Sequence, residues 1–299
     1  MMDLVRLSPK PLLPSGGPGI YRQIAELTGM EEGEECLVTP CGSGRSLELL
    51  VREMGVQGSG ADPDPGLVDE GRARARIEEL HGRIQYETAP PDNLPYRDEV
   101  FDVVLAEAGL TARADPSDAV RELVRVTRAG GRVALVQPVW TGAVDAERRQ
   151  RVGRQLGVQA LLLTQWKALL RDAGVENLHS ESWSEEGPGT EAGAEAPFPD
   201  FADLLGVRDK LGVLRRAWAR WGARGIYRAL VREAEVHRLL ARERLLGLSL
   251  IVGHKARVPV GSQPSAGPEP APDVVAPPSP QWAGSQEASG PFPSHHPAP

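Results

Sequence analysis

Short apolar runs alternate with amphipathic stretches between residues 18 and 139. The runs have the length of β-strands and end near glycine or acidic residues, whereas apolar positions in the stretches between them recur every three or four residues. The expected strands are Cys36–Val38, Val56–Ala61, Arg83–Glu87, Phe101–Leu105 and Gly131–Val139. The expected helices are Ile20–Met30, Ser46–Met54, Gly66–Leu80 and Ser117–Thr127. This alternation predicts parallel βαβ units, and therefore an α/β fold with helices on both faces of the sheet.

The pattern changes after Val139. Two more helices are expected at Ala143–Leu156 and Thr164–Ala173, followed by a sixth strand at Glu176–Trp183. An acidic, glycine-rich linker, Glu185–Glu195, then leads into a helical region from about Phe201 to Glu243. Arginines recur through this region at Arg215, Arg216, Arg220, Arg224, Arg228, Arg232, Arg238 and Arg242, with Arg244 just beyond. The apolar run Leu246–Gly253 predicts a last strand, which makes the helical region an insertion between the final two strands.

Charge and cysteine content narrow the class of protein. The net charge of −7 and the pI near 5.5 argue against general nucleic-acid binding, which needs a basic surface. The two cysteines are too few for a disulfide framework or a zinc cage, so a reducing cytoplasm is expected. The N-terminus shows no apolar signal segment, and the longest apolar stretch, Leu245–Val252, is far shorter than the roughly 20 residues of a membrane helix.

The segment from Cys36 to Ser46 carries the first candidate site. A strand that runs into Gly42-Ser43-Gly44 and then into a helix lets the backbone approach a ligand and points helix N–H groups at it. The dinucleotide-binding version needs a third glycine where this chain has Leu47, so pyrophosphate binding is disfavoured. Asp62 follows 18 residues after Gly44, where a carboxylate can accept hydrogen bonds from both hydroxyls of a ribose.

Further motifs follow this turn in a set order. Residues 89–96 read APPDNLPY, residues 101–104 read FDVV, residues 125–133 read RVTRAGGRV and residues 164–167 read TQWK. Together with CGSGRS at residues 41–46, the series resembles the small-molecule class I S-adenosylmethionine-dependent methyltransferases, the methyltransferase type 11 group, over roughly residues 16 to 255. The resemblance implies a Rossmann-like sheet that is mostly parallel with an antiparallel last strand, and S-adenosyl-L-methionine as the cofactor.

The resemblance also implies which residues bind the cofactor. The turn after the first strand would pass close to the methionine part, Asp62 would hold the ribose, and Pro63 would flank the adenine. The loop around Asp92 would lie near the adenine amino group, and the end of the fourth strand would border the sulfonium and methyl. The full expected set is Cys41, Gly42, Ser43, Gly44, Asp62, Pro63, Asp92, Asn93, Leu94 and Ala106. The Cys41 side chain itself is interpreted as packing.

Glu107 is the candidate catalytic residue. A sulfonium methyl is already activated, so the enzyme mainly aligns the acceptor with the methyl and the sulfur, and a base is needed only if the acceptor must lose a proton. Glu107 is expected to serve as that base or as an acceptor anchor, with a solvated loop carboxylate as an equal alternative. Tyr21, Trp140 and Trp166 could line an acceptor pocket, although core packing is the favoured interpretation. No metal site or nucleophilic triad is expected, because the six histidines are scattered.

Two departures from the family pattern keep an alternative open. The family usually has an acidic residue at the position of Val38, which helps to neutralise the amino group of the cofactor, and a glycine at the position of Pro40. Methyl transfer to a small organic acceptor is the favoured function, and a catalytically silent binding or regulatory protein on the same fold is the alternative. A nicotinamide-dependent oxidoreductase is disfavoured by Leu47 and by the lack of a Tyr-x-x-x-Lys pair.

The chain is expected to divide into five parts. Residues 1–17 form a lead-in, residues 18–184 the Rossmann-like cofactor-binding core, residues 185–244 the acidic linker and an Arg-rich helical cap, residues 245–256 the final core strand, and residues 257–299 a disordered Pro-rich tail. The expected partner is a small-molecule acceptor, with no nucleic acid and no membrane span.

Overall fold

The computed structural model describes residues 18–112, 114–142, 144–156, 159–183, 207–238 and 245–257. The expected lead-in, the acidic linker and the Pro-rich tail beyond residue 257 lie outside the described residues. So do residues 201–206 and 239–244 of the expected helical cap.

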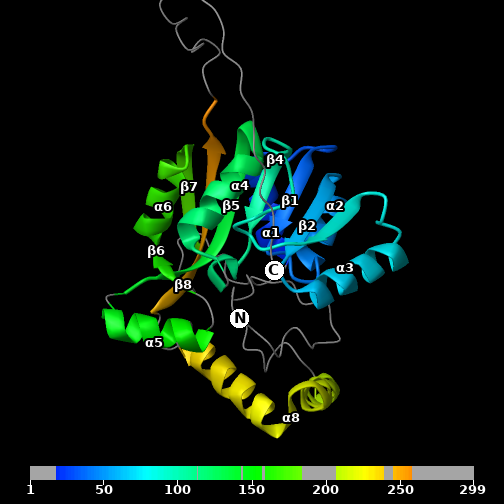
Figure 1. The fold of residues 1–299 in the computed structure, drawn as a ribbon, viewed down its shortest axis with the longest axis vertical. Helices are drawn as coiled ribbons and strands as arrows, with labels where there is room; N and C mark the ends of the chain where they lie inside the picture. The colour runs from blue at the N-terminus through cyan, green and yellow to red at the C-terminus, as the bar shows by residue number, and fades with distance from the viewer. Residues whose placement is uncertain are drawn as a thin grey trace, which may run out of the picture. The chain divides into compact units, whose positions relative to one another are not determined.

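The described strands form one mixed sheet in the order β3-β2-β1-β4-β5-β8-β7, with β6 paired to β5 (Figure 1). Their bounds are β1 Glu35–Thr39, β2 Gln57–Asp62, β3 Ile84–Thr88, β4 Phe101–Ala106, β5 Thr127–Trp140, β6 Leu161–Leu162, β7 Val175–Trp183 and β8 Leu246–Lys255. The pairs among β1 to β6 are parallel, whereas β8 is antiparallel to both β5 and β7. The expected α/β sheet with an antiparallel last strand is confirmed.

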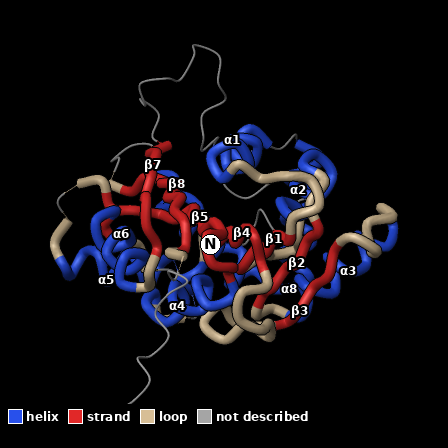
Figure 2. The backbone as a smooth tube through the Cα atoms, turned by 90° about the horizontal axis from the view of Figure 1, so that it is seen from above, coloured by secondary structure: helices blue, strands red, loops and turns tan. Residues whose placement is uncertain are grey.

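Helices cover both faces of this sheet. Their bounds are α1 Pro18–Thr28, α2 Arg45–Met54, α3 Pro65–Ile77, α4 Pro116–Val126, α5 Ala146–Leu156, α6 Leu163–Asp172 and α8 Val207–His237, with a short 3₁₀ turn, η3, at Leu110–Ala112. Helices α1 and α2 lie on one side of the sheet, and α4 and α6 lie on the other (Figure 2). Because neighbouring residues of a strand point to opposite faces, Cys36 and Val38 pack against the first layer and Leu37 against the second.

Aspartate–proline pairs start two of the helices. The Asp64 carboxylate accepts the N–H of Gly66 at 2.9 Å just before α3, and Pro65 occupies the first helical position. Asp115 accepts the N–H of Ser117 at 2.8 Å in the same way, directly before α4. An aspartate cap followed by proline satisfies an N-terminal amide and presets the helical φ angle. Both helices therefore begin at fixed points close to the carboxyl edge of the sheet.

Three features differ from the sequence-based expectations. Strand β5 begins at Thr127 rather than Gly131, because the register against β4 shifts between Phe101 and Val103 and accommodates the expected glycine turn within the strand. Strand β6 was not expected. Helix α8 is interrupted at Gly222 (φ 63°, ψ −177°), so the long helical region consists of two helical arms.

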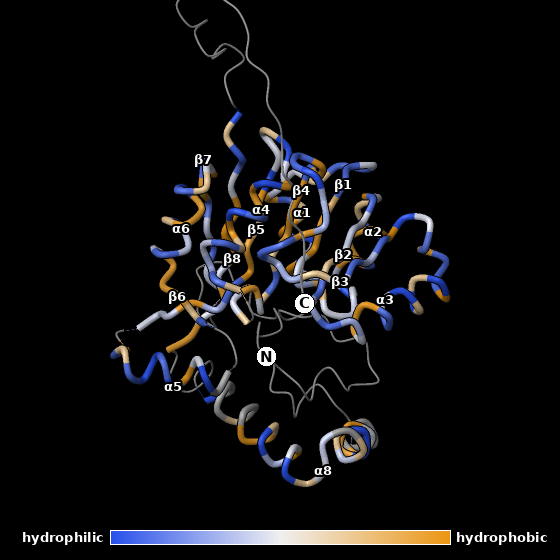
Figure 3. Tube along the Cα trace, viewed as in Figure 1, coloured by the Kyte–Doolittle hydropathy of each residue, from blue (hydrophilic) through white to orange (hydrophobic). Residues whose placement is uncertain are grey.

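Apolar residues recur along the central strands of the sheet, while α8 contains both polar and apolar residues (Figure 3). Several large apolar side chains of α8 are exposed, including Trp218 at 62% and Tyr227 at 70%. Helix α8 contacts α5 and lies between β7 and β8 in the sequence, as expected for an insertion. Within the described ranges, no helix is both long enough and apolar enough to cross a bilayer.

Candidate functional site

The turn between β1 and α2 has a left-handed backbone at both of its glycines. Gly42 has φ 57° and Gly44 has φ 79°, angles that residues with side chains adopt at a cost. A Cβ atom on Gly44 would lie 2.0 Å from the Tyr86 hydroxyl oxygen, whereas a Cβ on Gly42 would meet nothing within 4 Å. Gly44 therefore allows close packing beneath the turn, and Gly42 borders open space.

Asp62, at the end of β2, holds this turn in place. Its buried carboxylate accepts the N–H of Gly42 at 2.8 Å and the N–H of Asp64 at 2.9 Å. The first bond fixes the glycine turn and the second fixes the start of α3. A carboxylate has about four acceptor positions, so these bonds are compatible with the expected ribose contact. Asp62 thus has a structural role that the sequence did not reveal.

A nearly buried ion pair supports the turn from α2 and α3. Arg74 Nε donates to Glu48 Oε1 at 2.7 Å, and the side chains of the two residues are 11% and 9% exposed. The same guanidinium donates to the carbonyl oxygen of Ser43. Burial raises the pKa of Glu48, an effect that the charge of Arg74 opposes. The expected Ser43 is therefore held through its backbone by Arg74, a residue to which the sequence analysis assigned no role.

The loop that contains Asp92, Asn93 and Leu94 is anchored to α4. The N–H of Leu94 donates to Glu122 Oε1 at 2.7 Å, and Arg125 donates to the carbonyl oxygens of Leu94 and Tyr96 at 3.2 and 2.8 Å. Glu122 and Asp98 bind the same guanidinium and raise the pKa of Arg125. The other end of the loop is tied to β2, because the N–H of Ala89 donates to the carbonyl of Asp62 at 3.1 Å.

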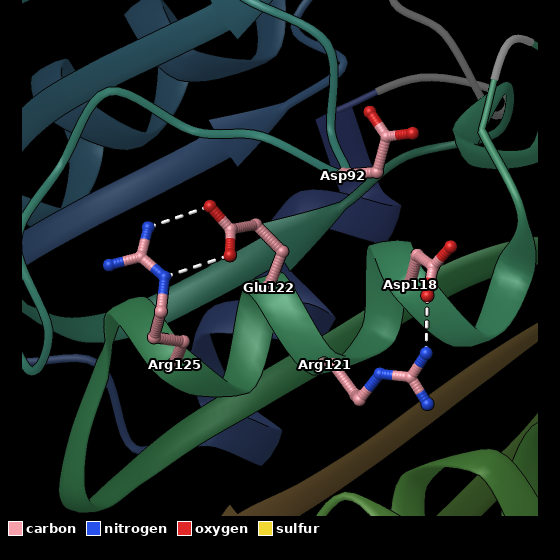
Figure 4. A pocket seen from close by; sticks show the side chains of 5 residues that line it. All are labelled: Asp92, Asp118, Arg121, Glu122 and Arg125. Carbon is pink, nitrogen blue, oxygen red and sulfur yellow. Dashed lines mark hydrogen bonds and ion pairs between the residues drawn. The ribbon is translucent and has the colours of Figure 1, made fainter.

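A charged surface pocket of about 450 Å³ adjoins this loop and α4 (Figure 4). Within it, Arg121 pairs with Asp118 and Arg125 pairs with Glu122, while Asp92 stands apart from both pairs. Asp92 is half-buried, Asn93 is exposed and Leu94 is buried in the α4 layer. The structure thus connects this loop with Asp62 through the backbone but places the Asp92 side chain at the pocket on α4.

Glu107 follows directly after β4 and is 2% exposed. The Ser46 and Tyr21 hydroxyls lie beside its carboxyl group, yet Oε1 has no hydrogen-bond partner. Burial raises the pKa of Glu107 to about 7, and the neighbouring Ser46 and Tyr21 hydroxyls only partly oppose this shift. The alternative of a solvated loop carboxylate is therefore wrong, and Glu107 is a buried acid at the carboxyl edge of the sheet.

Further buried polar atoms without partners belong to the same edge. They include Thr39 Oγ1 at the end of β1, Ser46 Oγ at the start of α2 and Gln137 Oε1 in β5. The amide nitrogen of Gln137 donates to the carbonyl oxygens of Ala106 and Glu107 at 3.1 and 2.8 Å, which joins β5 to the end of β4. Buried polar groups are nearly always paired in folded proteins, so such a group of unpaired atoms indicates a ligand site.

The three aromatic candidates occupy different places. Tyr21 is fully buried beside Glu107, whereas Trp166 packs in the α4 and α6 layer on the opposite face. Trp140 is buried and donates its indole N–H to the carbonyl of Ala160 at 2.8 Å. Core packing accounts for the two tryptophans, and Tyr21 remains close to the site. Both cysteines are buried free thiols, and burial raises the pKa of Cys36 to about 12.

The chain was compared with family models and with known proteins. The chain matches the family model described as "Methyltransferase domain" over residues 38–135, which span the glycine turn, Asp62, the Asp92 loop and Glu107. Methyltransferase GfsG of Streptomyces halstedii is 29% identical over 69% of this chain and 75% of that protein. The 27-O-demethylrifamycin SV methyltransferase of Amycolatopsis mediterranei is 32% identical over 54% of this chain and 61% of that protein.

The chain belongs to the class I S-adenosylmethionine-dependent methyltransferases. Solved structures share the fold of this methyltransferase. The [4+2]-cyclase SpnF has a TM-score of 0.64 at 21% identity and covers 81% of this chain and 82% of its own. The phosphoethanolamine N-methyltransferase 2 of Haemonchus contortus, solved in complex with S-adenosyl-L-methionine, also has a TM-score of 0.64, at 15% identity and over 83% of this chain and 55% of its own.

The residues present fit the cofactor of a methyltransferase of this class. The open space at Gly42 and the unpaired polar atoms of Thr39, Ser46, Glu107 and Gln137 gather at the carboxyl edge of the parallel strands. Ligands of open α/β sheets bind outside this edge. The departures expected to weaken the site are also present, since Val38 is buried in the apolar core and Pro40 has no N–H to offer.

Proposed function

We propose that this methyltransferase transfers the methyl group of S-adenosylmethionine to a small organic acceptor by direct in-line displacement. The observation that carries the proposal is the joint placement of the glycine turn, the Asp62 carboxylate and the unpaired buried polar atoms at one edge of the sheet. The names of the two curated relatives, one of which acts on demethylrifamycin SV, support an organic small molecule as the acceptor.

The residues of this chain have separate roles in the proposed reaction. The backbone of Gly42 to Gly44 would receive the methionine part of the cofactor, Asp62 and Pro63 the ribose and adenine, and the Asp92 loop the adenine amino group. The bound cofactor supplies an electrophilic methyl group, so the protein contributes mainly alignment and the exclusion of water. Ala106 and Glu107 would border the transferred methyl, where Glu107 can accept a proton if the acceptor is a hydroxyl.

We also propose a cytoplasmic location and an acceptor other than a nucleic acid. The buried free thiols Cys36 and Cys41 support a reducing compartment, and the net charge of −7 disfavours a polyanionic partner. The chain divisions expected from the sequence, with α8 in a cap, are retained as part of this proposal.

A silent binding protein on the same fold is the second candidate. It is favoured by Val38 and Pro40, which remove a carboxylate and a backbone donor from the region of the glycine turn. The fold similarity to a [4+2]-cyclase is compatible with chemistry other than methyl transfer, because fold alone does not determine activity.

Calorimetric titration separates these candidates. S-adenosylmethionine and S-adenosylhomocysteine are expected to bind with a Kd on the order of micromolar. Asp62→Asn should weaken binding at least about tenfold, because the carboxamide keeps only one acceptor oxygen and points a donor at a backbone N–H. Asp69→Asn is the matched control, since Asp69 lies on the exposed side of α3 with a 73% exposed side chain.

The outcomes are distinct. Binding that is lost in Asp62→Asn and kept in Asp69→Asn, with both variants folded by circular dichroism, supports the cofactor site. A lack of binding to the unmodified chain would contradict it and favour the silent protein. Bound cofactor without methyl transfer to any of a panel of hydroxyl, amine and carbon acceptors would favour a binding or regulatory role.

A further inference from the structure

The surroundings of Glu107 differ from those of the other buried carboxylates near the glycine turn. Glu48 has Arg74 as a cationic partner, and Asp62 accepts two backbone N–H groups. The Glu107 carboxyl group lies beside the Ser46 and Tyr21 hydroxyls, and no arginine, lysine or histidine of the described chain forms an ion pair with it. Burying an ionised carboxylate without a cationic partner costs free energy, so such an acid is stable only if it is protonated or if a bound ligand supplies the positive charge.

The groups that face Glu107 come from several elements, and none is positively charged. Tyr21 approaches from α1 and Ser46 from α2, both as hydroxyls, while Asp62 at the end of β2 adds negative potential. The Cys41 thiol in the glycine turn is neutral, since burial raises its pKa well above the ordinary value. Gln137 from β5 contacts the backbone of Glu107 through a neutral amide. With its pKa raised to about 7, Glu107 carries a proton in part of the molecules at neutral pH.

We propose that cofactor binding ionises Glu107, whose carboxylate then serves as the counter-ion of a positively charged group of S-adenosylmethionine. This inference rests on the proposed function. The proton leaves the carboxyl oxygen for the solvent, and no covalent bond to the cofactor forms. In the free protein the buried acid is then neutral in part of the molecules at neutral pH, and in the complex a buried negative charge faces a buried positive charge.

The position of Val38 explains why the chain needs such a group. The side chain at this position is fully buried among apolar residues of the α1 to α3 layer and offers no charge. S-adenosylmethionine carries an ammonium group and a sulfonium group, and a cation moved out of water without a partner is strongly destabilised. Among the carboxyl groups of the described site, Glu107 is the one with a buried oxygen, Oε1, that accepts no hydrogen bond.

The proposal predicts a measurable release of protons. At pH 6.5, a carboxyl with a pKa of about 7 is about three-quarters protonated, so binding should release about three-quarters of a proton per cofactor bound. Affinity should also depend on pH. Binding should be about tenfold weaker at pH 6 than at pH 8, because the acid must lose its proton before it can pair with the cation.

Calorimetry in buffers with different ionisation enthalpies measures this release at pH 6.5. Three ligands distinguish the source of positive charge: S-adenosylmethionine has both cations, S-adenosylhomocysteine has only the ammonium, and 5′-methylthioadenosine has neither. Release with the first two identifies the ammonium as the partner, and release with S-adenosylmethionine alone identifies the sulfonium. Equal release with 5′-methylthioadenosine, or no release with any ligand, would overturn the proposal.

Two carboxamide variants complete the test. Glu107→Gln keeps the shape of the side chain and is expected to bind with no proton release and with an affinity that no longer changes between pH 6 and 8. Glu87→Gln makes the same change at a half-exposed carboxyl within β3, and should release protons as the unmodified chain does. If the unmodified chain binds the cofactor without releasing protons, this inference alone is overturned. If the unmodified chain does not bind the cofactor at all, the proposed function is overturned with it. The ligand series on the unmodified chain remains decisive if Glu107→Gln does not fold.

Discussion

At the scale of single residues, the site depends on side chains that hold the backbone as well as on side chains that face a ligand. Asp62 shows this most clearly, because both of its carboxylate oxygens accept N–H groups of the turns that follow β1 and β2. Its position after an expected strand led to the prediction of a ribose contact, which stays a prediction, whereas its bond to Gly42 depends on a turn 20 residues away. No local pattern carries that information.

The glycine turn provides a prediction at the same scale. Gly44→Ala should lower the free energy of unfolding by about 1–3 kcal/mol more than Gly29→Ala, because the new Cβ would collide with the Tyr86 hydroxyl. Gly29 is the matched control, with φ 55° and nothing within 4 Å of an added methyl group. Urea denaturation of both variants measures the difference. Equal losses would mean that backbone strain alone, and not packing against Tyr86, requires glycine at position 44.

At the scale of elements, strands and helices followed from local patterns, whereas connections between them did not. The strands from β1 to β4 and helices α1 to α4 lie within a few residues of the expected ranges, because short apolar runs and apolar positions at helical spacing are local patterns. The start of β5 was missed, since its first residues are fixed by a register shift against β4. The break of α8 at Gly222 was missed because isolated glycines are tolerated in helices.

Arg125 connects α4 to the loop that contains Asp92, Asn93 and Leu94, and it provides the prediction at the scale of elements. Arg125→Ala should cost about 2 kcal/mol of stability and weaken cofactor binding, because four partners of one guanidinium are lost. Arg121→Ala removes an exposed arginine one turn earlier in the same helix, whose partners are Asp118 and Ser117, and should cost less than about 0.5 kcal/mol. Thermal unfolding and titration of both variants test this. Equal effects would argue against a positioning role for Arg125.

At the scale of the whole molecule, the buried acid at position 107 links stability to pH. Its pKa is raised to about 7 in the folded protein, from 4.5 for an exposed glutamate. The folded state therefore binds more protons than the unfolded state between these values, and stability falls as pH rises through this window. The loss is on the order of 3 kcal/mol relative to Glu107→Gln, which has no such group.

Urea denaturation at pH 5 and pH 8 measures this effect. The unmodified chain should lose stability relative to Glu107→Gln between the two pH values, and the difference isolates residue 107 because all other carboxyl groups are shared. Parallel changes in the two proteins would show that Glu107 is ionised in the free protein throughout this range. That result would also remove the basis for proton release on cofactor binding.

The placement of β8 has a consequence for the synthesis of the chain. Residues 246–255 are the last described strand to leave the ribosome, yet they occupy the interior of the sheet, hydrogen-bonded to β5 on one side and β7 on the other. Until they emerge, the edge of β5 that later pairs with β8 is open, and β7 has no described neighbour in the sheet. The growing chain therefore passes through an interval in which chaperones, or other nascent chains, can pair with the sheet before its own final strand does.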